Sequence, residues 1–325
     1  MTNIKDLAKY CNVSISTVSY ALNDSPRISH ETKQRIKQAA KDLHYIPNAS
    51  ARSLKCKHTS NIGVFIPGFE GTVHNLILSG IANVLTQSDS KYNMIVSLID
   101  DKMNLIKQRT VDIAIVMDSR IKDAQLHRLS EIEPIITFDK YSLGNNIYNT
   151  NIDNTLGTYL ETELLVKKGC KRIAFLLGSN ASYHNQNRYI GYVKALKDYG
   201  IELDVNLVYD ADAFTQIRGY EVIRDVIRNN DKLPFDAIVC ANDELAMGAM
   251  LALKEQNYNI PYDCKVVGFD NINMGQYFKP AVTTVAVDWV GYGVKLAQLA
   301  LDILAGKECE GFDMPVYIIE RDSSK

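Results

Sequence analysis

The sequence predicts an all-α helix-turn-helix head with a hinge helix, followed by an α/β domain built from two doubly wound subdomains. Three observations lead to this fold class. Short amphipathic helical patterns with tight breaks fill the first stretch of the chain. From Asn61 onward, continuous apolar runs alternate with helical stretches, as in parallel sheets covered on both faces. Residues 1–58 hold ten Lys and Arg against four Asp and Glu, whereas the remainder holds 26 against 34.

The bulk properties of the chain exclude a membrane protein. Its 325 residues exceed the size of one ordinary domain, and 46% of them are hydrophobic and 23% charged, as in globular proteins. No stretch approaches the roughly 20 uninterrupted apolar residues of a membrane helix. The N-terminus also lacks the apolar run and cleavage site of a signal peptide. We therefore expect a cytoplasmic protein with no membrane partner.

Three short helical patterns follow one another in the head, each with its own start signal. Asn3 can cap the first, with Asp6 placed as in a capping box, while Ser14 and Ser29 can cap the second and third. Residues 23–26, Asn-Asp-Ser-Pro, end the second pattern. The apolar positions at helical spacing are Ile4, Leu7, Ala8 and Cys11, then Val18, Ala21 and Leu22, then Ile36, Ala39, Ala40 and Leu43. Helix, tight turn, short helix, loop and helix together predict a helix-turn-helix.

The second helix of such a motif enters the major groove of DNA with its N-terminus first. Ile15, Ser16 and Thr17 are therefore expected near bases or phosphates, with Tyr20 one turn further along and Asn23 at the end. Spacing alone leaves a small helical bundle with polar caps open as an alternative. The charge balance of +6 over residues 1–58 favours a polyanionic partner, which is double-stranded DNA on this interpretation.

A short basic segment connects the head to the rest of the chain. Residues 45–48, Tyr-Ile-Pro-Asn, break the third helix, and the final Asn can cap a helix over residues 49–54 that is too short to be stable alone. Leu54, flanked by Arg52 and Lys55, fits a segment that folds on DNA, with basic groups on phosphates and the leucine wedged into the minor groove. The alternative is an ordinary linker with an incidental leucine.

The body of the chain repeats a β/α pattern in two successive series. Such series predict two doubly wound subdomains with a cleft between them, and ligands bind at the carboxyl ends of the strands. The predicted strands are residues 62–66, 94–98, 113–117 and 135–138 in the first series, and 172–177, 237–240 and 266–269 in the second, with a last strand at 316–320.

The sequence contains no motif that points to catalysis, a metal or a cofactor. It has neither a Gly-x-Gly-x-x-Gly fingerprint nor a Walker loop, and its six histidines are dispersed. The six cysteines form no Cys-x-x-Cys pair and are best explained as buried thiols in a reducing compartment. We expect no enzyme activity, no catalytic residue, no metal and no cofactor.

Several motifs in order resemble the head and hinge of the lactose/galactose-repressor (LacI/GalR) family. They are residues 4–8 (Ile-Lys-Asp-Leu-Ala), 13–14 with 17–19 (Val-Ser, Thr-Val-Ser), 21–23 (Ala-Leu-Asn), 45–48 (Tyr-Ile-Pro-Asn) and 51–54 (Ala-Arg-Ser-Leu). Many family members carry Arg directly after Thr-Val-Ser, where this chain has Tyr20. Operator sequences of relatives therefore do not transfer to this protein.

The resemblance continues through the body, which is similar in fold to periplasmic sugar-binding proteins. The matching landmarks are Asp153-Asn154 with Gly157, residues 169–175, Asn187-Arg188 with Gly191-Tyr192, Ala241–Asp243, Val267–Asn271, and Pro280 with Thr283–Val285. The resemblance implies a homodimer that binds a two-fold symmetric operator and senses a small-molecule effector in the cleft.

Three candidate effector-binding residues fit a sugar. Arg188 has five N–H donors for hydroxyls or a carboxylate. Asp270 follows a strand and can accept bonds from paired hydroxyls, and Phe214 matches the family's aromatic residue that stacks on the ligand face. Taken alone, Arg188 or Asp270 would more often be a surface ion pair or loop cap, and Phe214 a core residue.

Three further residues carry over to the cleft. Asp139 and Asn242 each follow a predicted strand, and His74, next to Val73, falls where the first β–α loop faces the cleft. Asn242 has a plainer alternative, because it can simply cap the helix that begins near Glu244.

These inferences combine into one organisation. The head is expected at residues 1–46, the hinge at 47–57, and the effector-binding and dimerisation domain at 58–325. We expect a repressor whose effector is a sugar, with a purine as second expectation because the family includes purine-sensing members. A soluble sugar-binding protein or a sugar-processing enzyme, a different class, would keep the cleft but lack the head.

Overall fold

The computed structural model describes residues 2–46, 58–87, 91–100, 103–118, 121–138 and 140–325. The chain divides into two compact units, Met1–Thr59 and Ser60–Lys325, and each is described by itself. The hinge candidates Arg52, Leu54 and Lys55 and the cleft candidate Asp139 lie outside the described residues. The expectations for them remain predictions.

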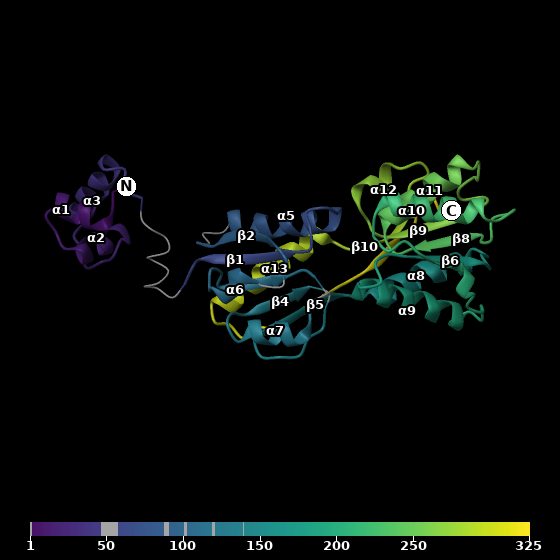
Figure 1. Cartoon of the computed structure of the whole chain (residues 1–325), viewed down its shortest axis with the longest axis horizontal. Helices are drawn as coiled ribbons and strands as arrows, with labels where there is room; N and C mark the ends of the chain where they lie inside the picture. The colour runs from purple at the N-terminus through teal and green to yellow at the C-terminus, as the bar shows by residue number, and fades with distance from the viewer. Residues whose placement is uncertain (1, 47–57, 88–90, 101–102, 119–120, 139) are drawn as a thin grey trace. The chain divides into compact units, whose positions relative to one another are not determined.

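The first unit is the predicted helix-turn-helix head. Its helices are α1 (Ile4–Tyr10), α2 (Ile15–Leu22) and α3 (His30–Asp42) (Figure 1). They enclose a small core formed by Leu7, Ala8, Cys11, Val18, Ala21, Ile36, Ala39 and Ala40. The predicted apolar positions therefore face inward, as helical periodicity requires.

All three predicted helix caps of the head are confirmed. The Asn3 side chain accepts bonds from backbone N–H groups of the first turn, and Asp6 returns a bond to the Asn3 N–H at 2.9 Å, which completes the capping box. Ser14 Oγ accepts from Thr17 N at 3.1 Å, and Ser29 caps α3 in the same way. These short-range bonds satisfy N–H groups that have no partner within the helix.

The second unit contains two sheets with helices on their faces (Figure 1). The first sheet has strand order β11-β5-β4-β3-β1-β2, and all its strands are parallel. Its strands are β1 (Asn61–Ile66), β2 (Asn93–Leu98), β3 (Ile113–Val116), β4 (Ile135–Phe138), β5 (Ile147–Ile152) and β11 (Phe312–Met314). Its helices are α5 (Thr72–Gln87), α6 (Asn104–Lys107), α7 (Asp123–Ser130) and α13 (Trp289–Leu304). We call this the first subdomain.

Two glycines allow α5 and α13 to pack closely in the first subdomain. A Cβ atom on Gly80 would lie 2.1 Å from Val290 O, and one on Gly293 would lie 2.1 Å from Ile77 O. Any side chain at either position would push the helices apart. The approach brings α13, which begins at Trp289, back from the far end of the chain onto the N-terminal sheet.

The second sheet, in the second subdomain, has strand order β12-β10-β9-β8-β6-β7, and only the pairing of β12 with β10 is antiparallel among the described pairs. Its strands are β6 (Ile173–Leu177), β7 (Val208–Asp210), β8 (Ala237–Cys240), β9 (Lys265–Asp270), β10 (Thr283–Ala286) and β12 (Tyr317–Ile319). Its helices are α8 (Asn154–Lys167), α9 (Tyr183–Asp198), α10 (Gln216–Arg228), α11 (Asp243–Glu255) and α12 (Asn273–Tyr277), with a short 3-10 turn at Val205–Leu207.

The predicted strands are present, but two expectations about them were incomplete. Strand β2 is an edge strand and is only half-buried, so it is not covered on both faces. The two β/α series are also not simply successive, because α13 and β11 return to the first subdomain after β10 has completed part of the second. Within the described residues, no helix has the length and apolarity to span a bilayer.

Candidate functional site

The predicted reading residues lie on the open side of α2. Ile15 is 44% exposed, Ser16 and Asn23 are exposed, and Thr17 and Tyr20 are half-buried. Ser16 and Tyr20 are four residues apart and therefore neighbours on one helix face. The Thr17 hydroxyl lies 2.8 Å from Ser14 Oγ at the helix start. The exposed side chains of Ile15, Ser16 and Asn23 are accessible to a partner.

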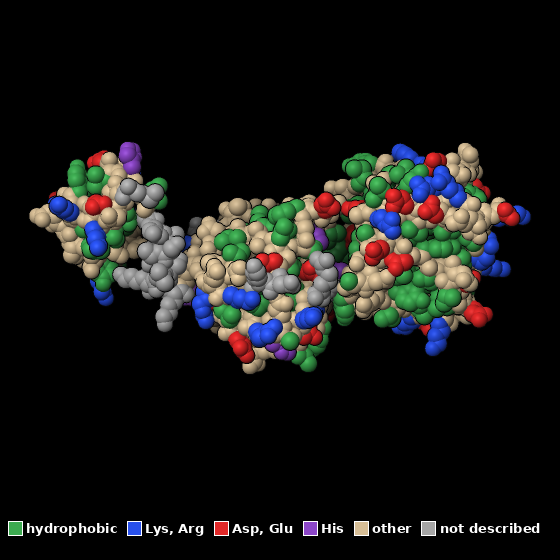
Figure 2. All heavy atoms as spheres, viewed as in Figure 1, with side chains coloured by type: hydrophobic (Ala, Val, Ile, Leu, Met, Phe, Trp, Pro, Cys, Tyr) green, Lys and Arg blue, Asp and Glu red, His purple; other side chains and the backbone are tan. Residues whose placement is uncertain are grey.

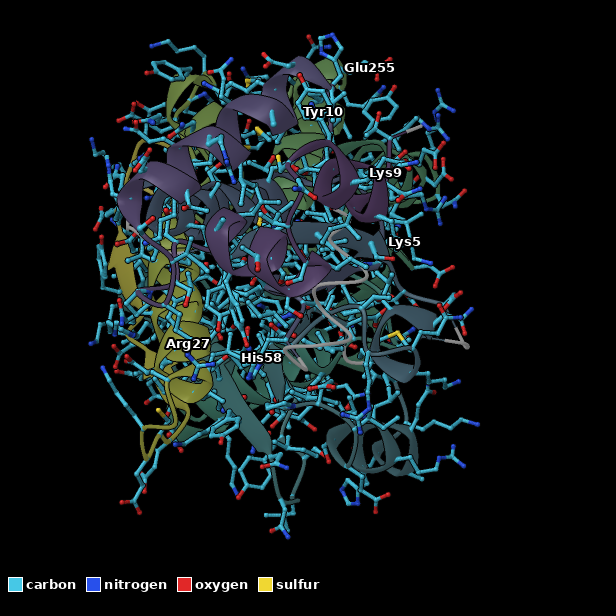
Figure 3. All side chains as sticks on the ribbon, turned by 90° about the vertical axis from the view of Figure 1, so that its left-hand side faces the viewer. Lys5, Lys9, Tyr10, Arg27, His58 and Glu255 are labelled. Atoms are coloured by element: carbon cyan, nitrogen blue, oxygen red, sulfur yellow. The ribbon has the colours of Figure 1, made fainter. Side chains whose placement is uncertain are left out.

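Tyr20 has a neighbour that sequence reasoning missed. Arg27, in the loop after α2, donates from Nη1 to Tyr20 Oη at 3.4 Å, and its Cζ lies 5.5 Å from the Tyr20 ring centroid. Arg27 lies on a different side of the head from Lys5 and Lys9 of α1 (Figure 3). The sequence carries no signal that Arg27 lies close to α2, because this depends on the path of the loop that follows the helix. The pair places a cation beside the reading face.

Replacing Tyr20 with Arg is expected to change base preference at one base pair in each operator half-site. Arginine can make a bidentate contact to guanine O6 and N7, worth about 1–3 kcal/mol of discrimination, whereas tyrosine offers a single hydroxyl. Selection of binding sites from random DNA measures the preference. Tyr10→Arg, at an exposed tyrosine of α1, is the matched control that adds the same charge elsewhere. Identical preferences for wild type and Tyr20→Arg would mean that Tyr20 reads no base.

A cavity of about 330 Å³ lies between the two subdomains of the second unit. It brings together five of the six predicted effector-binding residues, the sixth being outside the described residues. The first subdomain contributes Glu70, Gly71, Thr72, Val73, His74, Phe138 and Trp289. The second contributes His184, Arg188, Phe214, Thr215, Asn242, Glu244, Asp270 and Ile272. A molecule in this cavity would therefore touch both subdomains.

Arg188 is buried and held on all sides. Its Nε donates to Asn154 Oδ1 at 2.9 Å, Nη1 donates to the Ala241 carbonyl, and Nη2 donates to Asp270 Oδ1 at 3.3 Å. The guanidinium carbon also lies 3.7 Å from the centroid of the Phe269 ring. A guanidinium with fixed bonds and a stacked face presents its remaining N–H groups in one geometry. Asn154, the first residue of α8, was not predicted as part of this arrangement.

Asp270 ends strand β9 in an unusual backbone conformation. Its φ is +108°, and Asn271 follows with φ +53°. Both values are rare for residues with a side chain, and such strain gathers at binding sites. Burial raises the pKa of the Asp270 carboxyl, although the Arg188 guanidinium beside it acts in the opposite direction. The pair forms a polar wall inside a largely apolar cavity.

Asn242 and Phe214 are linked by a hydrogen bond. Asn242 Oδ1 accepts from Leu245 N at 2.9 Å and so caps α11, while Nδ2 donates to the Phe214 carbonyl at 3.1 Å. The helix-cap interpretation of Asn242 is therefore correct, and the residue also fixes the segment that carries Phe214. The Phe214 ring packs on Gly178, where a Cβ would lie 2.4 Å from the ring. The ring is thus packed against the segment after β6 and lines the cavity.

Aromatic residues that the prediction missed form another wall. Phe138 lies with its ring centroid 6.2 Å from that of Trp289 and 5.4 Å from that of His184. Phe138 ends strand β4, and His184 lies one helical turn before Arg188. The strand end could therefore have placed Phe138 at the cavity, and the shared helix face could have placed His184 there. Trp289 gave no such signal, because its position depends on the return of α13. Burial and the nearby His184 lower the pKa of His74, which favours its neutral form.

A fully buried glutamate lies behind the cavity. Glu161, on α8, has no exposed surface, and its Oε1 accepts from Val285 N at 3.3 Å. Burial is the main cause that raises the pKa of this carboxyl well above its ordinary value, and the nearby Asp243 and Asp270 act in the same direction, whereas Arg188 opposes them. The protonated form is therefore favoured in the folded protein over a wider range of pH.

The unfolding free energy is expected to fall as pH rises from the ordinary pKa of Glu161 to its raised pKa in the folded chain. In this window the folded state binds more protons than the unfolded state, and ionisation of a buried group then costs stability. Glu161→Gln should flatten this part of the profile, measured by chemical unfolding at several pH values. Glu163→Gln is the control on the same helix, because the pKa of Glu163 is lowered by Tyr199 and Lys167. An unchanged slope in Glu161→Gln would contradict the assignment.

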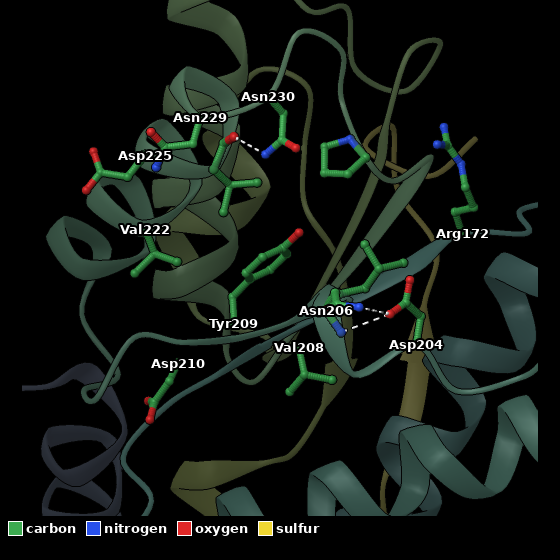
Figure 4. A pocket seen from close by; sticks show the side chains of 13 residues that line it. Arg172, Asp204, Asn206, Val208, Tyr209, Asp210, Val222, Asp225, Asn229 and Asn230 are labelled. Atoms are coloured by element: carbon green, nitrogen blue, oxygen red, sulfur yellow. Dashed lines mark hydrogen bonds between the residues drawn. The ribbon is translucent and has the colours of Figure 1, made fainter.

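A larger cavity, of about 710 Å³, lies at the outer edge of the second subdomain. Tyr209 of edge strand β7 projects toward its middle, with Arg172 and Asp204 on one side and Val222 and Asp225 on the other (Figure 4). Most of its polar lining residues are exposed, and it contains no buried ion pair among them. The smaller cavity is therefore the better candidate for a ligand site, because buried and fixed polar groups give specificity.

Acidic and basic side chains are interspersed over the visible face of the second unit (Figure 2). In the described part of the chain, no group of three or more His, Cys, Asp or Glu side chains is placed to hold a metal ion. The cavity described above offers a ligand hydrogen bonds, charge and aromatic surface.

Comparison with known proteins decides the family. Residues 3–48 match the model of bacterial regulatory proteins of the lacI family, and residues 162–324 match the periplasmic binding protein-like domain. The chain is 34% identical over 331 residues to the HTH-type transcriptional regulator RegA of Clostridium saccharobutylicum, covering 99% of this chain and 97% of RegA. The chain belongs to the LacI family. The resemblance found in the sequence is confirmed.

Other relatives agree with this assignment. The LacI-family chain is 30% identical to the HTH-type transcriptional repressor PurR of Erwinia tasmaniensis, over 99% of this chain and 97% of that protein. Its fold matches a crystal structure of the lac repressor dimer bound to operator and the anti-inducer ONPF, with a TM-score of 0.85, 24% identity and 99% of each chain covered. The predicted fold class is therefore confirmed, and the protein is a DNA-binding transcriptional regulator.

A second solved structure matches most of the chain. It is a LacI family transcriptional regulator from Enterococcus faecium with bound ribose, with a TM-score of 0.72 and 27% identity. The match covers 81% of this chain and 98% of that one.

Proposed function

We propose that this LacI-family regulator represses transcription and that a sugar bound between its two subdomains controls its affinity for the operator. The residues that bind the sugar are Arg188, Asp270, Phe214, Asn242, His74 and Asp139. On the DNA side, the head contacts the operator through Ile15, Ser16, Thr17, Tyr20 and Asn23. The hinge contacts the minor groove and phosphates through Arg52, Leu54 and Lys55.

The observation that carries this proposal is the buried Arg188–Asp270 pair in a cavity that aromatic residues also line. A sugar has paired hydroxyls on its edge and an apolar C–H face. The pair offers fixed donors and acceptors 3.3 Å apart, and the rings of Phe214 and Trp289 offer flat apolar surface. Polar groups that fix orientation within an apolar cavity are typical of small-molecule sites.

The relatives support two effector classes. The Enterococcus faecium regulator with bound ribose favours a sugar. The name of the PurR relative favours a purine as the second candidate. We prefer the sugar because the buried Arg188–Asp270 pair offers a fixed donor and acceptor to paired hydroxyls, which a purine base lacks.

The organisation follows from the same proposal. Residues 1–46 form the head, 47–57 the hinge and 58–325 the effector and dimerisation domain of a cytoplasmic homodimer on a two-fold symmetric operator. The effector changes the angle between the subdomains and so the approach of the two hinges. Effector and operator affinities are then reciprocally coupled. The protein is not an enzyme on this proposal.

A thermal-shift screen against monosaccharides, disaccharides and purine bases tests the effector class. A ligand that binds the folded state raises the unfolding temperature, by an amount set by its concentration relative to its Kd. We expect a shift with one or more sugars and none with purines. A shift with purines alone would replace the sugar by the second candidate. Gel retardation of operator-length DNA with and without the stabilising compound then shows the direction of control.

A further inference from the structure

The backbone at the end of β9 is strained where it enters the cavity. Asp270 and Asn271 both have positive φ, at +108° and +53°. Such conformations persist only where surrounding bonds hold them. Asp270 supplies a buried carboxylate to the cavity, so whatever holds this turn also sets where that carboxylate points.

Side chains from separate elements hold the turn. Trp289 Nε1 of α13 donates to the Asp270 carbonyl at 2.9 Å. Asn271 N donates to Thr284 Oγ1 of β10 at 3.1 Å, and Ile272 N donates to Asp243 Oδ2 of α11 at 2.9 Å. These three bonds act on backbone atoms and restrain the turn from different sides.

The fourth restraint comes from the last residues of the chain. Arg321, just after β12, donates from Nη2 to Asn271 Oδ1 at 2.6 Å and from Nη1 to the Val282 carbonyl at 2.8 Å. Its backbone N–H donates to Thr283 Oγ1 at 2.8 Å, which fixes where the side chain starts. The guanidinium therefore bridges the loop before β10 and the strained turn, a span that needs two separate N–H groups in fixed geometry.

Ser323, two residues further on, anchors the same segment at a different place. Its Oγ accepts from Thr283 N at 2.8 Å and donates to Val266 O at 2.6 Å. Val266 lies near the start of β9, away from the turn. Ser323 thus shares the structural role of the segment without touching Asn271 in any of these bonds, which makes it a natural comparison for Arg321.

We propose that Arg321 is a positioning residue of the effector site. It holds Asn271 so that the Asp270 carboxylate and the Trp289 indole face the cavity together. The assignment rests on the proposed function for its biological meaning, since that function makes the cavity the effector site. Whether Arg321 holds the turn at Asn271 can be tested without an effector.

Trp289 is the single tryptophan of the chain, and its indole donates a hydrogen bond to the turn. Tryptophan fluorescence therefore reports on the conformation of the turn. The experiment compares the emission maximum and acrylamide quenching of the full-length wild type, Arg321→Gln and Arg321→Lys. We expect red-shifted emission and stronger quenching in both variants, because neither side chain can make both guanidinium bonds. Ser323→Ala is the matched control, expected to lower the unfolding temperature while leaving emission and quenching unchanged.

Asn271→Gly supplies a second test, which compares the effect of Arg321→Gln with and without the Asn271 side chain. Glycine adopts positive φ without strain but lacks the Oδ1 that Arg321 binds. If Arg321 acts through Asn271, Arg321→Gln should add little quenching in the Asn271→Gly background, whereas independent effects would add. Wild-type fluorescence in folded Arg321→Gln, or fully additive effects, would overturn the proposal. Failure of every sugar in the thermal screen would instead refute the proposed effector class and leave this result standing.

Discussion

Operator affinity of this regulator is expected to fall by about 10³-fold or more between low and physiological salt. Each phosphate contact releases a condensed counterion, and the logarithm of affinity falls with the logarithm of salt in proportion to the number of contacts. Residues 1–58 carry ten Lys and Arg, and a dimer would present two such heads. The body carries the opposite charge balance and adds no attraction of its own.

Titration of labelled operator DNA at a series of salt concentrations measures the slope. Arg27→Gln should reduce it by about one contact per head, because the structure places this cation beside the reading helix. Lys232→Gln, an exposed residue of the second unit, removes the same charge from the body and should leave the slope unchanged. A flat dependence for wild type would rule out the head as a DNA-binding domain.

The head could be predicted closely because its signals are local. The capping residues Asn3, Ser14 and Ser29 act on N–H groups within their own first turns. Apolar spacing identified the buried faces of the same helices. What the sequence did not reveal was Arg27 beside Tyr20, since loops carry no periodicity from which side-chain contacts follow.

The body could be predicted in outline and not in connectivity. Buried strands read as apolar runs, but β5 has the polar interior Tyr-Asn-Thr-Asn, and β7 and β11 are three residues long. Such segments form strands because the edge of a neighbouring strand is available for pairing, and this depends on the tertiary structure. The return of α13 to α5 depends likewise on the paired glycines Gly80 and Gly293, whose meaning appears only when the helices are side by side.

The candidate site shows the same division. Residues at strand ends, such as Asp270 and Asn242, could be placed near the cavity because parallel strands share one carboxyl edge. The bonds that fix the surrounding groups could not, because Asn154 and Ala241 hold Arg188, and Arg321 holds Asn271, across long sequence separations. Family motifs located the cavity-lining groups, and the structure supplied the residues that orient them.

Removing either partner of the Arg188–Asp270 pair is expected to weaken effector binding at least tenfold and also to destabilise the protein. Their side chains are 4% and 8% exposed, so the surviving partner would be a buried and poorly compensated charge. Breaking such a pair costs about 3–5 kcal/mol of unfolding free energy. Arg188→Ala and Asp270→Ala are therefore expected to shift both the effector titration and chemical unfolding. Arg218→Ala breaks the more exposed Arg218–Glu221 pair and should cost less than about 1 kcal/mol.

A double variant separates the two effects. Arg188→Met with Asp270→Asn removes both charges while keeping similar volume, and replacing a buried ion pair by neutral groups is often close to neutral for stability. We therefore expect the double variant to regain much of the unfolding free energy lost in the alanine variants, yet to bind effector as poorly as they do. Recovery of stability together with wild-type effector affinity would remove both residues from the binding site. Loss of affinity in a stable double variant would leave direct contact with the effector as the reason for the pair's position in the cavity.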